Sequence, residues 1–196
     1  MAVTPTIHEV MAAFRDVRRS PAVPEGERAT VLASTGLAYF CGLTPRQLLN
    51  ARRRALDVAI RQIEVPGPLR RRPIVYRIPE ALMPDLCDAL PSRSHRRSQF
   101  VLPVGDLARP ARLFASASGW PVADLWGSLR RAAITHCCAA NGIGAAFEFS
   151  GLLSDQALRL IDWSQVPVGN RGAVIDCESL LLAPRVRVQY TEQVDA

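Results

Sequence analysis

The chain has 196 residues, 48% of them hydrophobic, which is enough for one large domain or for one domain with a tail. Its formal net charge is +6, and all 24 basic residues are arginine because the sequence contains no lysine. This composition excludes mechanisms that need a lysine and favours anionic partners, since a guanidinium presents a planar set of N–H donors that matches a phosphate. A genome rich in G and C would produce the same arginine bias, so charge alone does not identify a partner.

The sequence shows no sign of a membrane or secretory segment. No apolar run reaches the roughly 18 to 20 residues that span a bilayer, and the first ten residues lack the basic start and apolar block of a signal peptide. We therefore expect a cytoplasmic protein. Its irregularly spaced cysteines and few histidines predict free thiols, with no disulfide, metal site or cofactor. The cysteines are Cys41, Cys87, Cys137, Cys138 and Cys177.

Two helices are predicted at the start of the chain. Thr6 followed three residues later by Glu9 is a capping box, which predicts a helix from Ile7 to about Arg18. Prolines end this helix, and we treat residues 1–24 as a lead-in segment. The pattern EGERATVLASTGLAYFC predicts a second helix over residues 25–41.

A third helix and a β-hairpin follow. Pro45 suits the first turn of a helix predicted to run to about Arg54. Residues 57–65 and 70–79 have the alternation of strands, and the turn PGPL between them predicts a hairpin. Residues 80–90 are then predicted to form another helix.

The second half is predicted to be helical up to a C-terminal tail. Residues 91–104 combine serines with arginines and predict a basic loop. Helices are expected at about 107–117, at 122–140, where Asn141 and Gly142 suit a helix end, and at 143–149 and 154–163. The tail, residues 167–196, contains candidate strands at 173–178 and 185–192. The order of elements predicts a mainly α fold with a small antiparallel β-sheet (α+β).

Three segments resemble, in order and approximate spacing, the catalytic domain of tyrosine recombinases, the phage-integrase family. The run LAYFCGLTPRQLLNARRRALD (37–57) is similar to the family's opening motif, which reads roughly LLLYTGLRPSELLALRWSDVD. The arginine-rich hairpin is the second segment. The third, LWGSLRRAAITHCCAANGIG (125–144), resembles the family's HDLRRTAATHLLEAGV. The resemblance implies a recombinase-like domain over residues 25–166, with DNA as its partner.

The sequence departs from the family at most of its catalytic positions. Members cleave DNA with a tyrosine nucleophile, while two arginines, a lysine and histidines stabilise the charged transition state. Here the second arginine is retained as Arg130, and the lysine is absent. The other catalytic positions are occupied by Thr44, Gln47, Gly127, Leu152 and, near the nucleophile, Ile161 or Asp162. The resemblance therefore implies a protein that no longer cleaves DNA.

Seven arginines are candidate phosphate contacts, and each also has a structural interpretation. They are Arg52, Arg53, Arg70, Arg72, Arg96, Arg97 and Arg130. Arg70 and Arg72 point to the same side of a strand. The Arg52–Arg54 run could instead be the solvated end of a helix, where cations oppose the dipole. The 91–104 loop could be ordinary surface, and Arg130 could pair with Asp124 or Glu148.

These features predict a catalytically inactive, recombinase-like protein that binds duplex DNA or assists a DNA-processing complex, alone or with a recombinase partner. Two alternatives remain open. The chain could be an interaction scaffold that kept the fold without DNA binding and self-associates through its tail. It could also be an atypical active recombinase that uses Tyr190, in VQYTE, as the nucleophile.

Overall fold

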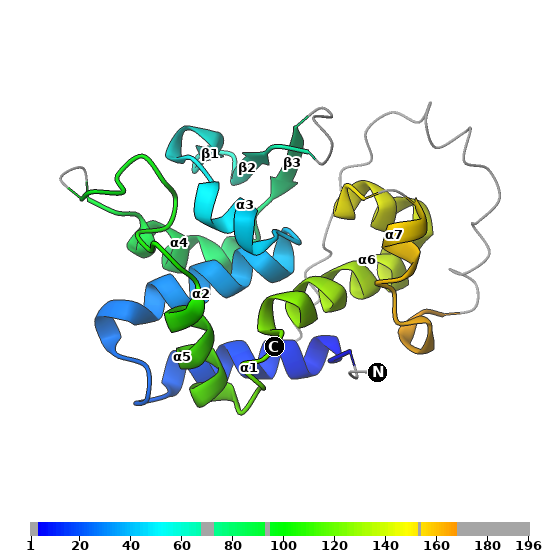
Figure 1. Ribbon diagram of the computed structural model, residues 1–196, viewed down its shortest axis with the longest axis horizontal. Helices are drawn as coiled ribbons and strands as arrows, with labels where there is room; N and C mark the ends of the chain where they lie inside the picture. Colours follow the sequence, from blue (N-terminus) through cyan, green and yellow to red (C-terminus); the bar gives the residue numbers. More distant parts are fainter. Residues whose placement is uncertain (1–3, 68–72, 93–94, 153, 168–196) are drawn as a thin grey trace.

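The computed structural model describes residues 4–67, 73–92, 95–152 and 154–167. The chain is mainly helical with one three-stranded antiparallel sheet, which confirms the predicted fold class. Helix α2 crosses the centre of the molecule, with the sheet above it and α1 below it (Figure 1). The candidate strands at 173–178 and 185–192 lie outside the described residues.

Helix α1 (Ile7–Arg19) begins at the predicted capping box. The hydroxyl of Thr6 accepts a hydrogen bond from the backbone N–H of Glu9 at 3.3 Å, and the Glu9 carboxylate accepts one from the backbone N–H of Thr6 at 2.7 Å. The buried face of α1 packs against α2 and α5, so the lead-in helix shares the main core. Its buried side chains are Val10, Ala13, Phe14 and Val17.

Helix α2 (Glu25–Phe40) is the central element, because α1, α4, α5 and α6 all pack against it. Every residue from Val31 to Tyr39 is buried. Two of its buried hydroxyls are satisfied within the helix, since Ser34 and Thr35 donate to the carbonyl of Val31 at 3.0 and 2.7 Å. The helix is therefore buried on all sides over residues 31–39, the part of its sequence that has no charged residue.

Helix α3 (Pro45–Asn50) is shorter than predicted, and the extension to Arg54 was wrong. Ala51 and Arg52 leave helical geometry, and residues 53–55 form a single 3-10 turn. The backbone of Arg52 pairs instead with Phe100 in an isolated antiparallel bridge. The arginine run therefore does not compensate the dipole at the end of α3.

The sheet consists of three short strands in sequence order, each antiparallel to the next. They are β1 (Leu56–Asp57), β2 (Gln62–Val65) and β3 (Ile74–Arg77). The predicted hairpin is confirmed by the pairing of β2 with β3, in which Ile63 lies opposite Tyr76. Both side chains are buried against the helices.

The predicted first strand is divided by a tight turn. The Asp57 carboxylate accepts hydrogen bonds from the backbone N–H groups of Ala59 and Ile60 at 3.0 and 3.2 Å, and this closes a turn between β1 and β2. A single strand over residues 57–65 was therefore wrong. Val58 and Ile60, which lie between β1 and β2, are 43% and 57% exposed.

Two helices of the middle region agree with the prediction. A 3-10 turn at Glu80–Leu82 leads into α4 (Met83–Ala89), and Pro84 is tolerated because it lies in the first turn. Helix α5 (Ala108–Ser118) ends at Gly119, whose φ of 73° is the left-handed conformation that glycine adopts without a steric cost.

Helix α6 (Leu125–Ser150) is interrupted where Asn141 and Gly142 predicted an end. Gly142 has φ 84° and ψ 173°, which is not helical, yet a second helical piece follows at once. The predicted helices at 122–140 and 143–149 are thus two parts of one long element. Figure 1 shows α6 running from the centre of the molecule towards α7.

The two ends of the described chain meet on α6. After α7 (Ser154–Leu158) and a 3-10 turn at Trp163–Gln165, the Gln165 side chain donates to the Thr4 carbonyl at 2.5 Å. His136 lies 3.1 Å from the Pro5 carbonyl through Nε2 and 2.7 Å from the Tyr39 hydroxyl through Nδ1. A carbonyl can only accept, so Nε2 carries the proton and Nδ1 accepts from Tyr39. Burial lowers the pKa of His136, which favours this neutral form.

Two negative observations apply to the described part of the chain. No helix there combines the length and apolarity needed to cross a membrane. No group of three or more His, Cys, Asp or Glu side chains there is arranged to hold a metal ion.

Candidate nucleic-acid interface

Thr44 and Gln47, which the resemblance placed at the family's first arginine and its acidic neighbour, form a neutral helix cap. The Thr44 hydroxyl accepts from the backbone N–H of Gln47 at 3.3 Å, and Gln47 Oε1 accepts from the backbone N–H of Thr44 at 2.9 Å. Gln47 Nε2 also donates to the Pro66 carbonyl at 3.2 Å, which ties α3 to the β2–β3 connection. These two residues supply structure and no positive charge.

We expect Thr44→Ala to lower the free energy of unfolding by about 1 kcal/mol, because α3 loses its side-chain cap. DNA affinity should not change, since the hydroxyl carries no charge. Urea denaturation measures the first quantity. Thr44→Ser is the control that keeps the cap, and a wild-type stability for Thr44→Ala would contradict the capping role.

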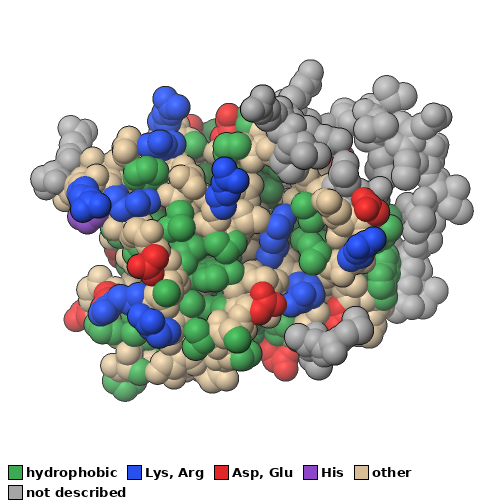
Figure 2. All heavy atoms as spheres, viewed as in Figure 1, with side chains coloured by type: hydrophobic (Ala, Val, Ile, Leu, Met, Phe, Trp, Pro, Cys, Tyr) green, Lys and Arg blue, Asp and Glu red, His purple; other side chains and the backbone are tan. Residues whose placement is uncertain are grey.

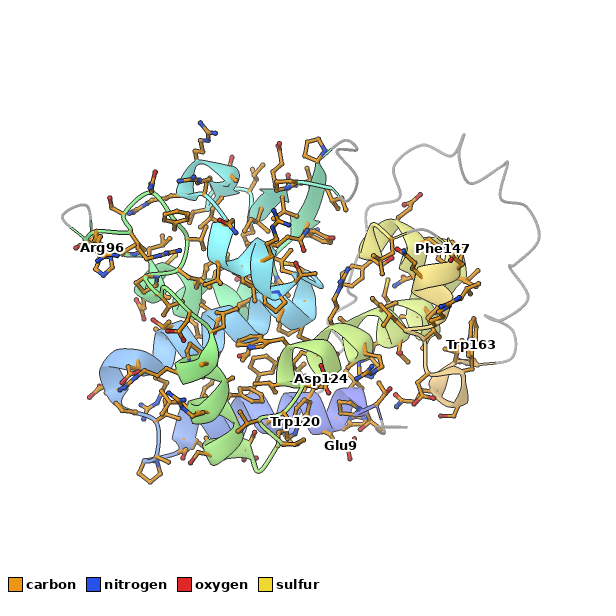
Figure 3. All side chains as sticks on the ribbon, viewed as in Figure 1. Glu9, Arg96, Trp120, Asp124, Phe147 and Trp163 are labelled. Atoms are coloured by element: carbon orange, nitrogen blue, oxygen red, sulfur yellow. The ribbon has the colours of Figure 1, made fainter. Side chains whose placement is uncertain are left out.

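Gly127, which the resemblance placed at the histidine of the family's HxxR motif, lies next to an ion pair. A Cβ added to Gly127 would lie 2.1 Å from Asp124 Oδ1. The Asp124 carboxylate accepts a hydrogen bond from Arg131 at 2.9 Å. Figure 3 shows Asp124 at the N-terminal end of α6. The interpretation of Arg130 as the partner of Asp124 was therefore wrong, because the next arginine forms that pair.

Arg130 is a half-buried cation with few partners. Its guanidinium donates to the Ser150 carbonyl at 3.3 Å, and its Nε is buried without any hydrogen-bond partner in the described part of the chain. No carboxylate of the described residues, Glu148 included, forms an ion pair with it. Burial lowers the pKa of Arg130, although an arginine stays protonated at neutral pH.

Tyr76 lies beside Arg130 and joins β3 to the end of α6. Its hydroxyl donates to the Phe149 carbonyl at 2.8 Å, and its ring meets the Phe149 ring edge-to-face with centroids 5.6 Å apart. Burial raises the pKa of Tyr76, so the hydroxyl remains protonated. Because it is buried and already bonded, Tyr76 supports the site and is not a candidate nucleophile.

A second group of arginines gathers where residues 51–54 meet residues 95–101. We call it the arginine ledge, and it consists of Arg52, Arg53, Arg54, Arg96 and Arg97. Backbone hydrogen bonds hold the two segments together, from Arg53 N–H to the Gln99 carbonyl and from Val101 N–H to the Ala51 carbonyl, both at 2.9 Å. A hollow of about 630 Å³ is lined by Arg52, Arg53, Arg54, Ser98 and Gln99.

The ledge carries positive charge with no opposing carboxylate. Within the described segments, none of its five arginines forms an ion pair. Four of them are exposed, and Arg97 is half-buried. Arg96 lies at the surface on the side of the molecule away from α7 (Figure 3). Figure 2 shows arginines spread over the visible face with acidic side chains among them, so local clusters matter more than net charge.

The remaining predicted positions divide into two groups. Arg70, Arg72 and Tyr190 lie outside the described residues. At the positions expected for the later histidine and the nucleophile, Leu152 is half-buried, Ile161 is buried, and Asp162 accepts hydrogen bonds from Ser164. None of these three side chains can act as a phenolic nucleophile.

The structure brings together four of the predicted arginines, Arg52, Arg53, Arg96 and Arg97, and places Arg130 on a different element. Arg54 belongs to the arginine run that the sequence singled out, whereas Phe100 was not among the candidate residues. The available signal was the aromatic residue directly after the run RSHRRSQ, since an aromatic ring can hold a guanidinium over its face.

Comparison with known proteins gives structural matches only. No protein-family model matches the sequence, and neither does any curated protein. The crystal structure of XerA recombinase matches 81% of this chain and 63% of its own length, with 17% identity and a TM-score of 0.59. The Tn1549 transposon integrase, in complex with a circular intermediate DNA, matches 81% of this chain and 61% of its own, with 11% identity and a TM-score of 0.60. The chain thus corresponds to less than two thirds of either protein, and it has the fold of a recombinase catalytic domain.

Proposed function

We propose that this chain is a catalytically inactive, recombinase-like DNA-binding or accessory protein that contacts duplex phosphates through arginines. Arg130 carries the proposal. Among the described residues this half-buried guanidinium has no carboxylate partner, so a single carbonyl hydrogen bond offsets only part of the cost of desolvating the charge. A phosphate would supply the missing acceptor atoms.

The loss of catalysis is proposed from the residues that replace the family's charged groups. Thr44 and Gln47 form a cap, the Asp124–Arg131 pair covers Gly127, and Ile161 is buried and apolar. Removing one such stabilising group typically costs about two to three orders of magnitude in rate. Several are replaced here at once, which supports binding without cleavage.

A recombinase-like fold also supports DNA as the ligand. One of the structural matches described above, the Tn1549 integrase, is in complex with a circular intermediate DNA. In this chain the formal charge of +6 and the unpaired arginines would supply attraction to phosphates without the catalytic step.

The experiment is a binding titration against salt. We expect fluorescence anisotropy with a labelled duplex of about 20 base pairs to give an affinity whose logarithm falls linearly with the logarithm of salt concentration, with a slope of about −3 or steeper between roughly 50 and 200 mM. A flat salt response, or no binding at the lowest salt, would contradict DNA binding.

Incubation with a nicked suicide duplex tests the inactive state separately. We expect no covalent protein–DNA adduct. An adduct that disappears on Tyr190→Phe would establish an active recombinase and refute the loss of catalysis.

A further inference from the structure

We propose that the arginine ledge is a second phosphodiester-binding site, separate from Arg130, in which three arginines contact the backbone of DNA and two position the others. This inference rests on the proposed function, since it takes DNA as the partner. Arg52, Arg54 and Arg96 are the contacting residues. Arg53 and Arg97 are the positioning residues, and Phe100 orients two of the guanidiniums.

Each positioning residue donates a side-chain hydrogen bond to a backbone carbonyl of another segment. Arg97 donates to the Leu49 carbonyl at 2.8 Å and so fastens the 95–101 segment to the last turn of α3. Arg53 donates to the Pro91 carbonyl at 2.9 Å and fastens the other side of the ledge to the segment after α4. Both bonds cross long stretches of sequence, so they hold the two basic segments at a set spacing.

Phe100 allows like charges to lie close together without an acidic partner. The guanidinium carbon of Arg52 lies 4.4 Å from the Phe100 ring centroid, and that of Arg97 lies 4.2 Å from it. The negative face of the ring attracts each cation. A guanidinium that stacks through its face keeps its in-plane N–H donors available. Within the described residues the Arg52 side chain forms no ion pair, so its N–H donors are available to a ligand.

The ligand chemistry follows from the number and arrangement of donors. Three consecutive arginines, Ser98 and Gln99 line one hollow, and Arg96 lies exposed on the neighbouring segment. A single carboxylate would be satisfied by one guanidinium. A strand of DNA offers successive anionic groups, each with several acceptor oxygens, so it can engage Arg52, Arg54 and Arg96 together.

The test compares variants of the full chain in the duplex-binding titration. We expect the double variant Arg52→Gln, Arg54→Gln to bind at least about tenfold more weakly and to reduce the magnitude of the salt slope by about two. Phe100→Leu keeps every charge and should still weaken binding about three- to tenfold, because the stacked guanidiniums lose their support. Arg15→Gln removes one exposed charge from α1, on the opposite side from the sheet, and should change affinity less than about twofold.

The outcomes distinguish a failure of the ledge from a failure of DNA binding as a whole. If the wild-type chain does not bind duplex DNA, the proposed function fails and the ledge fails with it. If Arg130→Gln weakens binding while the ledge variants behave like Arg15→Gln, only the ledge is refuted. If the ledge variants lose binding to a labelled polyglutamate peptide but bind DNA as the wild-type chain does, the ledge is a site for acidic protein. That result would also overturn this inference. The single variant Arg54→Gln controls for misfolding. The Arg54 side chain makes no hydrogen bond or ion pair with the described residues, so its replacement should leave the fold intact.

Discussion

Replacing Arg130 with glutamine should weaken binding to duplex DNA by about 10- to 100-fold, the loss that follows from removing one charged hydrogen-bonding contact. The same variant should be as stable as the wild-type protein or slightly more stable. The reason is that Arg130 is half-buried, has a pKa lowered by burial, and lacks a carboxylate in the described part of the chain. Removing an unpaired, partly desolvated charge relieves a cost in the free protein.

The neighbouring Arg131 provides a matched control. Arg131→Gln removes the same charge one residue later, but it breaks an existing ion pair with Asp124 at 2.9 Å. We expect it to lower stability by less than about 1 kcal/mol, as for other surface pairs, and to change DNA affinity only slightly. Anisotropy titrations and urea denaturation of both variants measure the two quantities. A loss of stability without a loss of affinity in Arg130→Gln would show that Arg130 is purely structural.

Replacing Phe114 with alanine should lower the free energy of unfolding by about 3 to 5 kcal/mol, the cost of emptying a well-packed aromatic site. Phe114 on α5 is completely buried, and its ring meets Phe14 of α1 and Trp120 edge-to-face, with centroids 5.8 Å apart in both pairs. Figure 3 shows Trp120 in the region where α5 and α1 approach each other. The change therefore removes contacts from two interfaces at once.

The control for Phe114→Ala is Val122→Ala, a truncation at a side chain that is 49% exposed and should cost less than about 0.5 kcal/mol. Urea denaturation followed by circular dichroism measures both values. A cost below about 1 kcal/mol for Phe114→Ala would mean that the core between α1 and α5 is not well packed. Binding of DNA by the folded fraction should remain unchanged, because Phe114 contributes no charge.

Local signals in the sequence predicted the helix boundaries that depend on nearby residues. The start of α1 follows from Thr6 and Glu9, which bond to each other across three positions. The end of α5 follows from Gly119, whose left-handed conformation is a property of the residue itself. In both cases the interacting groups lie within one turn of the helix, so they can be identified without the tertiary structure.

The failures occurred where a distant residue competes with local preference. Helix α3 was predicted to include Arg54, but it ends at Asn50 because the backbone of Arg52 pairs with Phe100. The partner of Asp124 was misassigned because its identity depends on how the chain enters α6. Asp124 has a positive φ of 59° there, and its carboxylate pairs with Arg131 instead of Arg130.

The sequence by itself determined the chemical inventory of this protein. It has 24 arginines and no lysine, and the family resemblance drawn from it predicted that Arg130 is the retained catalytic arginine. The tertiary structure decided which arginines share a site and which have partners. The acceptors at Leu49, Pro91 and Ser150 are distant in sequence from the arginines that bond to them. Hydrogen bonds and cation–π contacts act over only a few ångströms, so folding alone decides which of these cations are held in place by distant parts of the chain.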